Sequence, residues 1–184
     1  MNALNAGTAA ALRGDDEAFS PFVERWYGST VRLARLLSGD DETARRAARD
    51  AWLSVIGRLG ELDGSAPLHL VVLRATLETL AAGPPAVAVN APFDPDVFEV
   101  EGHRWAGWWR DDTSPEEWAR PPADEALAGA LAGLDPATAA VVTLRDVEQL
   151  SANEVEAVLE LTPADQRALL HQGRAGVWKA LAGV

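Results

Sequence analysis

The stretch LDPATAAVVTLRDVEQLSANEVEAVLELTPADQRALLHQGRAGVWKAL spans residues 134–181 and decides the fold. Inside it, Ser151 and Glu154 form a Ser-x-x-Glu capping box, which predicts the start of a short helix. Thr162 followed by Pro163 predicts the start of a longer helix, because proline suits the first helical position. A short capped helix, a tight turn and a longer capped helix are typical of a helix-turn-helix.

The longer helix carries a local excess of positive charge, because residues 166–184 include arginine, lysine and histidine but no acid. Since a helix-turn-helix places its second helix in the major groove of DNA, we predict DNA contacts from Thr162, Gln166, Arg167, His171, Arg174 and Lys179. Gln166 and Arg167 lie near the helix start and are expected to reach base edges. Arg174 and Lys179 are expected to meet phosphate or solvent. From periodicity alone, a helical hairpin that only packs is the alternative.

The charge of the whole chain opposes a nucleic-acid partner. The 184 residues include 16 basic and 28 acidic side chains, which gives a formal net charge of -12. Phosphate neutralisation by lysine and arginine supplies most of the non-specific affinity for DNA. Contact with DNA is therefore expected through one local basic surface. Cysteine is absent, which excludes disulfides and thiolate metal sites and favours a reducing cytoplasm.

Two further helices are predicted between residues 17 and 59. Ser38-Gly39 is a natural break between them, because glycine tolerates the left-handed conformation that ends many helices. Asp40 or Asp41 is then placed to cap the helix that follows. That second helix has one apolar stripe, which is most simply core: Ala44, Ala47, Ala48, Ala51, Trp52, Val55, Ile56 and Leu59.

A third helix is expected from about Ser65 to the stop at Gly83-Pro84-Pro85, and residues 84–122 differ from everything around them. They hold most of the prolines, many acids and four of the seven tryptophans, which are Trp105, Trp108, Trp109 and Trp118. We interpret them as a linker without regular structure. Since solvated disorder is usually poor in aromatic residues, the tryptophans are expected to pin the linker onto a module or a partner. After the linker, Asp135-Pro136 predicts a helix that runs to about Glu148.

The sequence contains no catalytic or membrane-spanning pattern. The histidines His69, His103 and His171 are isolated, and no spacing of His, Asp and Glu resembles a metal site. Glycine, proline or charge interrupts the longest apolar stretches, so no segment is expected to cross a membrane. The N-terminus also lacks the pattern of a secretory signal. We therefore expect a cytoplasmic protein that is not an enzyme and needs no cofactor.

Residues 134–181 resemble region four of extracytoplasmic-function sigma factors, the module that contacts the upstream promoter element in that family. The stretch EAFSPFVERWYGSTVRLARLLSGDDETARRAARDAWLSVIGRL, residues 17–59, resembles region two, including the acid-then-aromatic step Asp50-Ala51-Trp52. DPDVF and HRWAGWW resemble the linker of one subset of the family. The resemblance spans roughly residues 13–181. It implies core RNA polymerase, promoter DNA and an anti-sigma protein as partners, with polymerase contacts from Arg46, Arg49, Asp50 and Trp52.

The sequence departs from this family at places that carry its activity. Where the family has an acidic, Gln-containing stretch that docks on polymerase, this chain has Arg45-Arg46-Ala47-Ala48-Arg49. Where the family has an Arg-rich helix that opens the minus-ten element, this chain has LHLVVLRATLETLAAGPP, residues 68–85, whose only basic groups are His69 and Arg74. A surface that holds melted DNA needs cationic and aromatic groups. In the tight turn, Glu160 replaces the usual small glycine.

Two functions follow from these observations. In the first, the chain is a sigma factor that binds core RNA polymerase and promoter DNA and directs transcription initiation. In the second, it is a degenerate sigma-like protein without promoter melting, which regulates through protein contacts or one DNA element. For either, the expected fold is all-α. It comprises a region-two-like module at residues 13–83, a Trp- and Pro-rich linker at 84–122, and a region-four-like helix-turn-helix module at 123–184.

Overall fold

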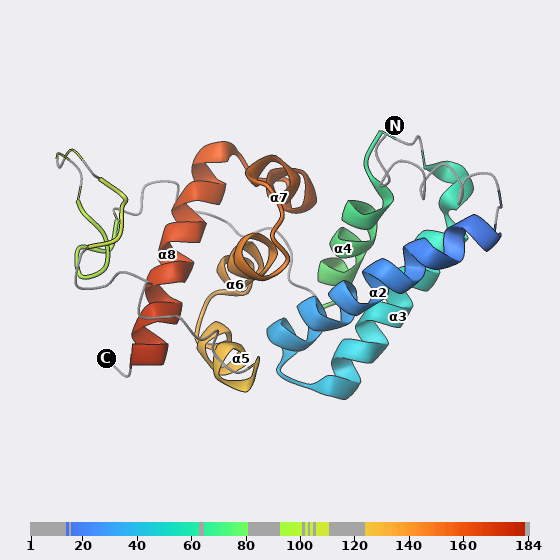
Figure 1. Ribbon diagram of the computed structural model, residues 1–184, viewed down its shortest axis with the longest axis horizontal. Coiled ribbons are helices and arrows are strands. Elements are labelled where there is room, and N and C mark those ends of the chain that lie inside the picture. The colour runs from blue at the N-terminus through green and yellow to red at the C-terminus, as the bar shows by residue number, and fades with distance from the viewer. Residues whose placement is uncertain are drawn as a thin grey trace.

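The computed structural model describes residues 14, 16–62, 65–80, 93–100, 102, 104, 106–110 and 124–182. Within these ranges the regular elements are all helices, and one isolated β-bridge joins Phe98 to Trp109. The all-α prediction is therefore confirmed. The helices form two neighbouring groups, α2–α4 at one end of the molecule and α5–α8 at the other (Figure 1).

The first group contains α2 (Asp16–Ser38), α3 (Asp41–Gly57), the short 3-10 helix η1 (Leu59–Glu61) and α4 (Leu68–Thr79). The predicted break between its first two helices is confirmed, because Gly39 follows α2 with a φ of +67°. Asp40 caps α3, and its side chain accepts a hydrogen bond of 2.7 Å from the backbone N–H of Thr43.

The second group contains α5 (Asp124–Ala132), α6 (Pro136–Val142), the π-helical segment η3 (Thr143–Val147), α7 (Ala152–Leu159) and α8 (Pro163–Ala182). The capping box at Ser151 and Glu154 is confirmed, since both of its hydrogen bonds are present. Glu160 ends α7 in the left-handed conformation, with a φ of 55°. The helix predicted to run to about Glu148 ends at Val147, and its last five residues, Thr143–Val147, form the wider π-helical segment η3.

One hydrophobic cluster holds the two groups together. Buried leucines of α2 and α4, namely Leu33, Leu36, Leu70, Leu73 and Leu77, belong to the same cluster as the buried apolar side chains of α5–α8. A second cluster lies within the first group and contains Leu68, Val72 and Ala75 of the same helix α4. Helix α4 therefore packs on two sides, and apolar burial, the main favourable term in folding, crosses from one group to the other.

Polar contacts reinforce this junction. The guanidinium of Arg74 on α4 donates hydrogen bonds to the carbonyl oxygens of Ala157 and Val158, the latter at 3.1 Å, and to Glu160 Oε1 at 2.7 Å. These carbonyls lie at the C-terminal end of α7, where a cation is favoured by the helix dipole. The sequence identified Arg74 as one of two basic groups on α4, and the structure uses it as a cap for the neighbouring helix.

Helices α6 and α8 approach each other closely at Gly173. A Cβ atom built on Gly173 would lie 2.3 Å from Val142 Cγ2 and 3.0 Å from Thr138 Cγ2. Glycine is therefore required here by space, and α8 is fixed against α6 along the side that faces the core.

Candidate functional site

The start of α8 is exposed and well capped. Thr162 Oγ1 donates a hydrogen bond of 2.6 Å to Asp165 Oδ2 and accepts one of 3.2 Å from the Asp165 backbone N–H. Arg167 lies one turn further on with an exposed side chain, and no residue in the described ranges pairs with it. Gln166, by contrast, is only 4% exposed, so this conformation turns it toward the core and away from any base edge.

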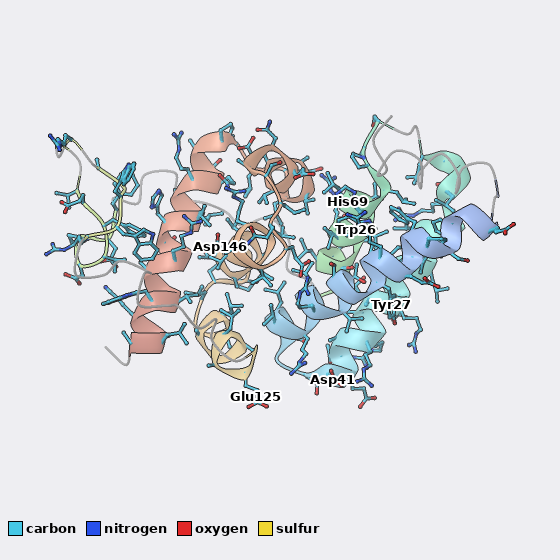
Figure 2. All side chains as sticks on the ribbon, viewed as in Figure 1. Trp26, Tyr27, Asp41, His69, Glu125 and Asp146 are labelled. Carbon is cyan, nitrogen blue, oxygen red and sulfur yellow. The ribbon has the colours of Figure 1, made fainter. Side chains whose placement is uncertain are left out.

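The remaining basic side chains of α8 are engaged inside the chain. Arg174 forms a bidentate ion pair with Asp146 of η3, through Nε at 2.9 Å and Nη2 at 2.7 Å (Asp146 is labelled in Figure 2). Lys179 Nζ lies 2.9 Å from Asp94 Oδ2 and 3.3 Å from Asp96 Oδ2. Sequence reasoning missed these carboxylate partners. As arranged here, Arg174 and Lys179 are already neutralised by acids.

His171 is half-buried beneath linker residues. Its ring centroid lies 4.6 Å from that of Phe93 and 4.8 Å from that of Phe98. Burial lowers the pKa of His171, and the nearby positive charges of Arg174 and Arg167 lower it further. His171 therefore contributes a neutral aromatic ring at neutral pH and adds no charge to the basic surface predicted for α8.

Linker residues 93–100 and 106–110 pack on α8, and phenylalanine contributes to this contact as well as tryptophan. Val97 and Phe98 are buried against Ala175, and Trp109 and Trp178 pack around them. Trp108 faces outward and is 65% exposed. Trp105, Trp118 and His103 lie outside the described residues.

The outer face of α3 is the second candidate surface. Arg46, Arg49 and Asp50 are exposed, as expected for residues that lie off the apolar stripe, and Arg49 Nε lies 3.4 Å from Asp50 Oδ1. Leu53 is 61% exposed, and Ile56, which the stripe predicted as core, is 42% exposed. The face thus combines arginines with two large apolar side chains. Exposed neighbouring apolar side chains of this kind are typical of a protein-binding surface.

Trp52 is a core residue in this structure and not part of that face. Only 4% of it is exposed, its Nε1 donates a hydrogen bond of 3.0 Å to Thr30 Oγ1, and its ring packs edge-on against Phe22. The core position predicted for Trp52 is confirmed, because α2 covers that side of α3. Its polymerase contact stays a prediction.

His69 lies buried at the junction of the two helix groups. Its ring stacks on Trp26 at 4.3 Å between centroids, and its Nε2 lies 3.9 Å from Glu154 Oε1 of α7 (Figure 2 labels His69 and Trp26). Burial lowers the pKa of His69 and outweighs the opposing effect of Glu154, while Arg25 lowers it further. His69 is therefore neutral in the folded protein near neutral pH.

We expect the protein to lose stability as the pH falls below the ordinary histidine pKa of about 6.5. His69 and His171 both have lowered pKa values in the folded state. Below that pH the unfolded chain binds more protons than the folded chain, so the free energy of unfolding falls, by at most about 1.4 kcal/mol per pH unit for each histidine. Urea denaturation at about pH 7.5 and 5.5 measures the change. Replacing both histidines by phenylalanine should flatten it, and equal wild-type stability at the two pH values would contradict the expectation.

No helix in the described part of the chain is both long enough and apolar enough to cross a membrane. No family model matches the chain, and no curated protein matches it. Among solved structures the chain is similar to CnrH, an extracytoplasmic-function sigma factor whose structure was determined in complex with the cytosolic domain of CnrY. The TM-score is 0.71 and the identity 18%, with 99% of each chain covered. The chain therefore has a fold like that of extracytoplasmic-function sigma factors.

Proposed function

We propose that this protein is a sigma-type transcription regulator that binds core RNA polymerase through the outer face of α3 and promoter DNA through the start of α8. The observation that carries the proposal is the fold, which matches that of CnrH over 99% of both chains. The short helix α7, the turn at Glu160 and the longer helix α8 support the DNA contact, and the exposed face of α3 supports the protein contact. The cytosolic domain of CnrY bound to CnrH also makes a protein of the anti-sigma kind a reasonable partner for this chain.

The start of α8 is the part of the helix-turn-helix that is open to DNA. Arg167 and Thr162 are exposed there, and the positive end of the helix dipole favours phosphate at the first turn. The net charge of -12 makes approach of DNA unfavourable elsewhere on the chain. Binding is therefore expected to be weak, local and strongly dependent on salt.

A second candidate function, regulation without promoter melting, is favoured by helix α4. This helix occupies the position where the resemblance places DNA opening, yet eight of its twelve residues are buried. Its arginine, Arg74, is bound to the end of α7. Single-stranded DNA needs exposed aromatic and cationic groups, and α4 offers neither in this arrangement.

One experiment separates the two functions. The protein is mixed with core RNA polymerase, and co-purification is measured first. Transcription from a promoter library and permanganate reactivity of unpaired thymines are then measured on the same complexes. Specific transcripts with reactive thymines support a complete sigma factor. Polymerase or duplex binding without reactive thymines supports the second function, and absence of both kinds of binding overturns the proposal.

Replacing Arg167 by alanine is expected to weaken duplex binding by about fivefold to a hundredfold if it contacts a base, with a smaller loss and a shallower salt dependence if it contacts phosphate. Fluorescence anisotropy with labelled duplex at several salt concentrations measures both quantities. Arg58→Ala is the matched control, because Arg58 is also exposed but lies at the end of α3. Equal losses for the two variants would show a general charge effect and would argue against a DNA contact by Arg167.

A further inference from the structure

The side of α8 that faces away from the core is occupied by another part of the chain. His171, Ala175, Trp178 and Lys179 recur at the spacing of one helix face, opposite the side that carries Gly173. The occupant, here named the cover segment, is residues 93–100 and 106–110. In Figure 1 it lies beside α8, on the side away from the other helices.

The cover segment is a small hairpin with one apolar face. The backbone N–H of Glu99 donates to the Trp108 carbonyl at 2.9 Å, and that of Arg110 donates to the Val97 carbonyl at 3.1 Å. Val97 and Phe98 point to α8, where they are 0% and 1% exposed. Both side chains are therefore packed against α8 in the same apolar cluster as Ala175.

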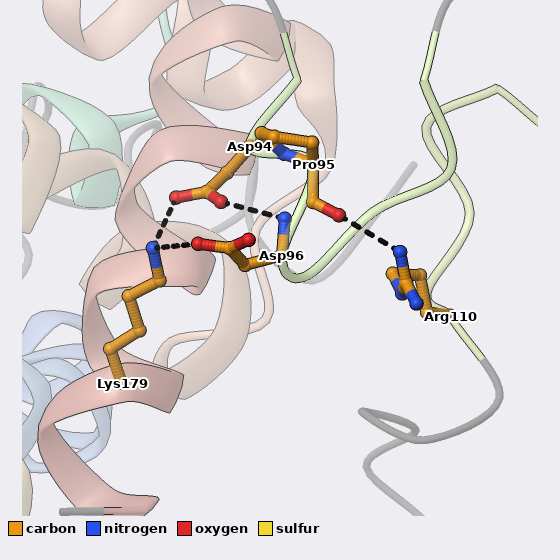
Figure 3. Close-up of polar contacts among 5 residues, drawn as sticks. All are labelled: Asp94, Pro95, Asp96, Arg110 and Lys179. Carbon is orange, nitrogen blue, oxygen red and sulfur yellow. Dashed lines mark hydrogen bonds and ion pairs between the residues drawn. The ribbon is translucent and has the colours of Figure 1, made fainter. Parts of the chain in front are cut away.

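Charge is matched as well as shape. Two carboxylates, those of Asp94 and Asp96, lie within 3.3 Å of the Lys179 ammonium (Figure 3). Asp94 Oδ1 also accepts a hydrogen bond from the Asp96 backbone N–H at 3.1 Å, which fixes the acidic turn. Lysine meets oxygen anions in the same way on a phosphate backbone. The acidic turn therefore occupies a position in which Lys179 would otherwise meet DNA phosphate.

We propose that the cover segment is a displaceable cover of the α8 surface, and that duplex DNA and the cover segment compete for this surface. The inference rests on the proposed DNA contact of α8. DNA that follows α8 beyond its first turns meets the outer side of the cover segment and its acidic turn before it meets His171 or Lys179. The docked segment thus reduces the affinity of the protein for DNA, and its release exposes one more cation and the side of α8 opposite the core.

The polar part of the contact is suited to release because its ion pairs are individually modest. An ion pair in which Lys179 is 35% exposed contributes little stability and is screened by salt. The hairpin is a small unit outside the main hydrophobic cluster, and such units open locally more readily than a large core does. Several DNA phosphates acting together can therefore replace two carboxylates.

A single cysteine tests displacement directly. The chain has no cysteine of its own, so Val97→Cys places one thiol in the protein, at a position that is 0% exposed while the segment is docked. Its rate of modification by a maleimide is measured with and without a duplex pool of random sequence at low salt. Displacement is expected to raise the rate about tenfold or more under saturating duplex.

Affinity measurements provide the second test. Asp94→Asn/Asp96→Asn is expected to bind the duplex about two- to fivefold more tightly, with a salt slope steeper by about 0.9 because Lys179 gains a phosphate. Glu24→Gln/Glu61→Gln is the matched control, since it changes net charge equally at two exposed sites on α2 and η1. Phe98→Ala releases the segment without changing charge and should also raise affinity.

The outcomes distinguish this inference from the proposed function. Faster labelling with duplex, together with a gain for the aspartate pair that exceeds the gain for the glutamate pair, supports competition. Duplex binding with an unchanged labelling rate and equal gains for both pairs overturns the inference and leaves DNA binding intact. Failure of all variants to bind duplex at low salt overturns the proposed DNA contact of α8 and the inference with it, while the polymerase contact is tested separately by co-purification.

Discussion

Replacing Trp52 by alanine is expected to lower the free energy of unfolding by about 3–5 kcal/mol. The substitution removes a side chain that is 4% exposed and leaves a cavity between α2 and α3. It also removes the Trp52 Nε1–H group that donates a hydrogen bond to Thr30 Oγ1, and Thr30 is buried. Urea denaturation followed by circular dichroism measures the loss.

The neighbouring residue Leu53 is the matched control, because it lies on the same helix but is 61% exposed. Leu53→Ala is expected to change stability by less than about 0.5 kcal/mol, while weakening co-purification with core RNA polymerase if the outer face of α3 is the docking surface. A Trp52→Ala protein with the wild-type denaturation midpoint would contradict the core assignment. Loss of polymerase binding by Trp52→Ala in a fully folded protein would restore its predicted role in docking.

Replacing Gly173 by alanine is expected to destabilise the protein by about 1–3 kcal/mol, because the new Cβ overlaps a tightly packed neighbour. The atom would lie 2.3 Å from a methyl group of Val142, whose branched side chain has little rotamer freedom within α6. The clash therefore moves α8 relative to α6 or shifts the Val142 rotamer. The thermal midpoint and urea denaturation measure the effect.

Gly129→Ala in α5 serves as the control for glycine removal in a helix. A Cβ at Gly129 meets nothing within 4 Å, so the substitution is expected to stabilise the protein by about 0.5–1 kcal/mol through helix propensity alone. The two alanine substitutions should thus have opposite signs. If Gly173→Ala were also stabilising, α6 and α8 would be packed less closely than described.

Helix ends could be predicted from the sequence because capping is a local interaction. Asp40, Ser151 and Thr162 each bond to a residue three positions away, so the pattern and the contact are visible in one short stretch. The break at Gly39 follows from the same local logic. The all-α fold follows in turn from helix periodicity between such ends.

The state of the candidate surfaces could not be predicted because their partners are distant in sequence. Lys179 and Asp94 are 85 residues apart, and Arg174 and Asp146 are 28 apart. The absence of acids from residue 166 onward therefore predicted a basic helix. In the folded chain, acids from other segments pair with two of its basic side chains. Gln166 lies next to the exposed Arg167, and a shift of about 100° around the helix decides which of them meets the core. The π-helical widening at η3 also leaves no mark in the apolar pattern.

Helix α4 lies between two clusters, with Leu68, Val72 and Ala75 in one and Leu70, Leu73 and Leu77 in the other. Moving the helix groups apart would expose Leu70, Leu73 and Leu77 to water, and exposure of apolar surface increases the heat capacity. The association of the groups is consequently sensitive to temperature and weakens on cooling, as hydrophobic contacts do. Cooling is therefore expected to favour separation of the two helix groups.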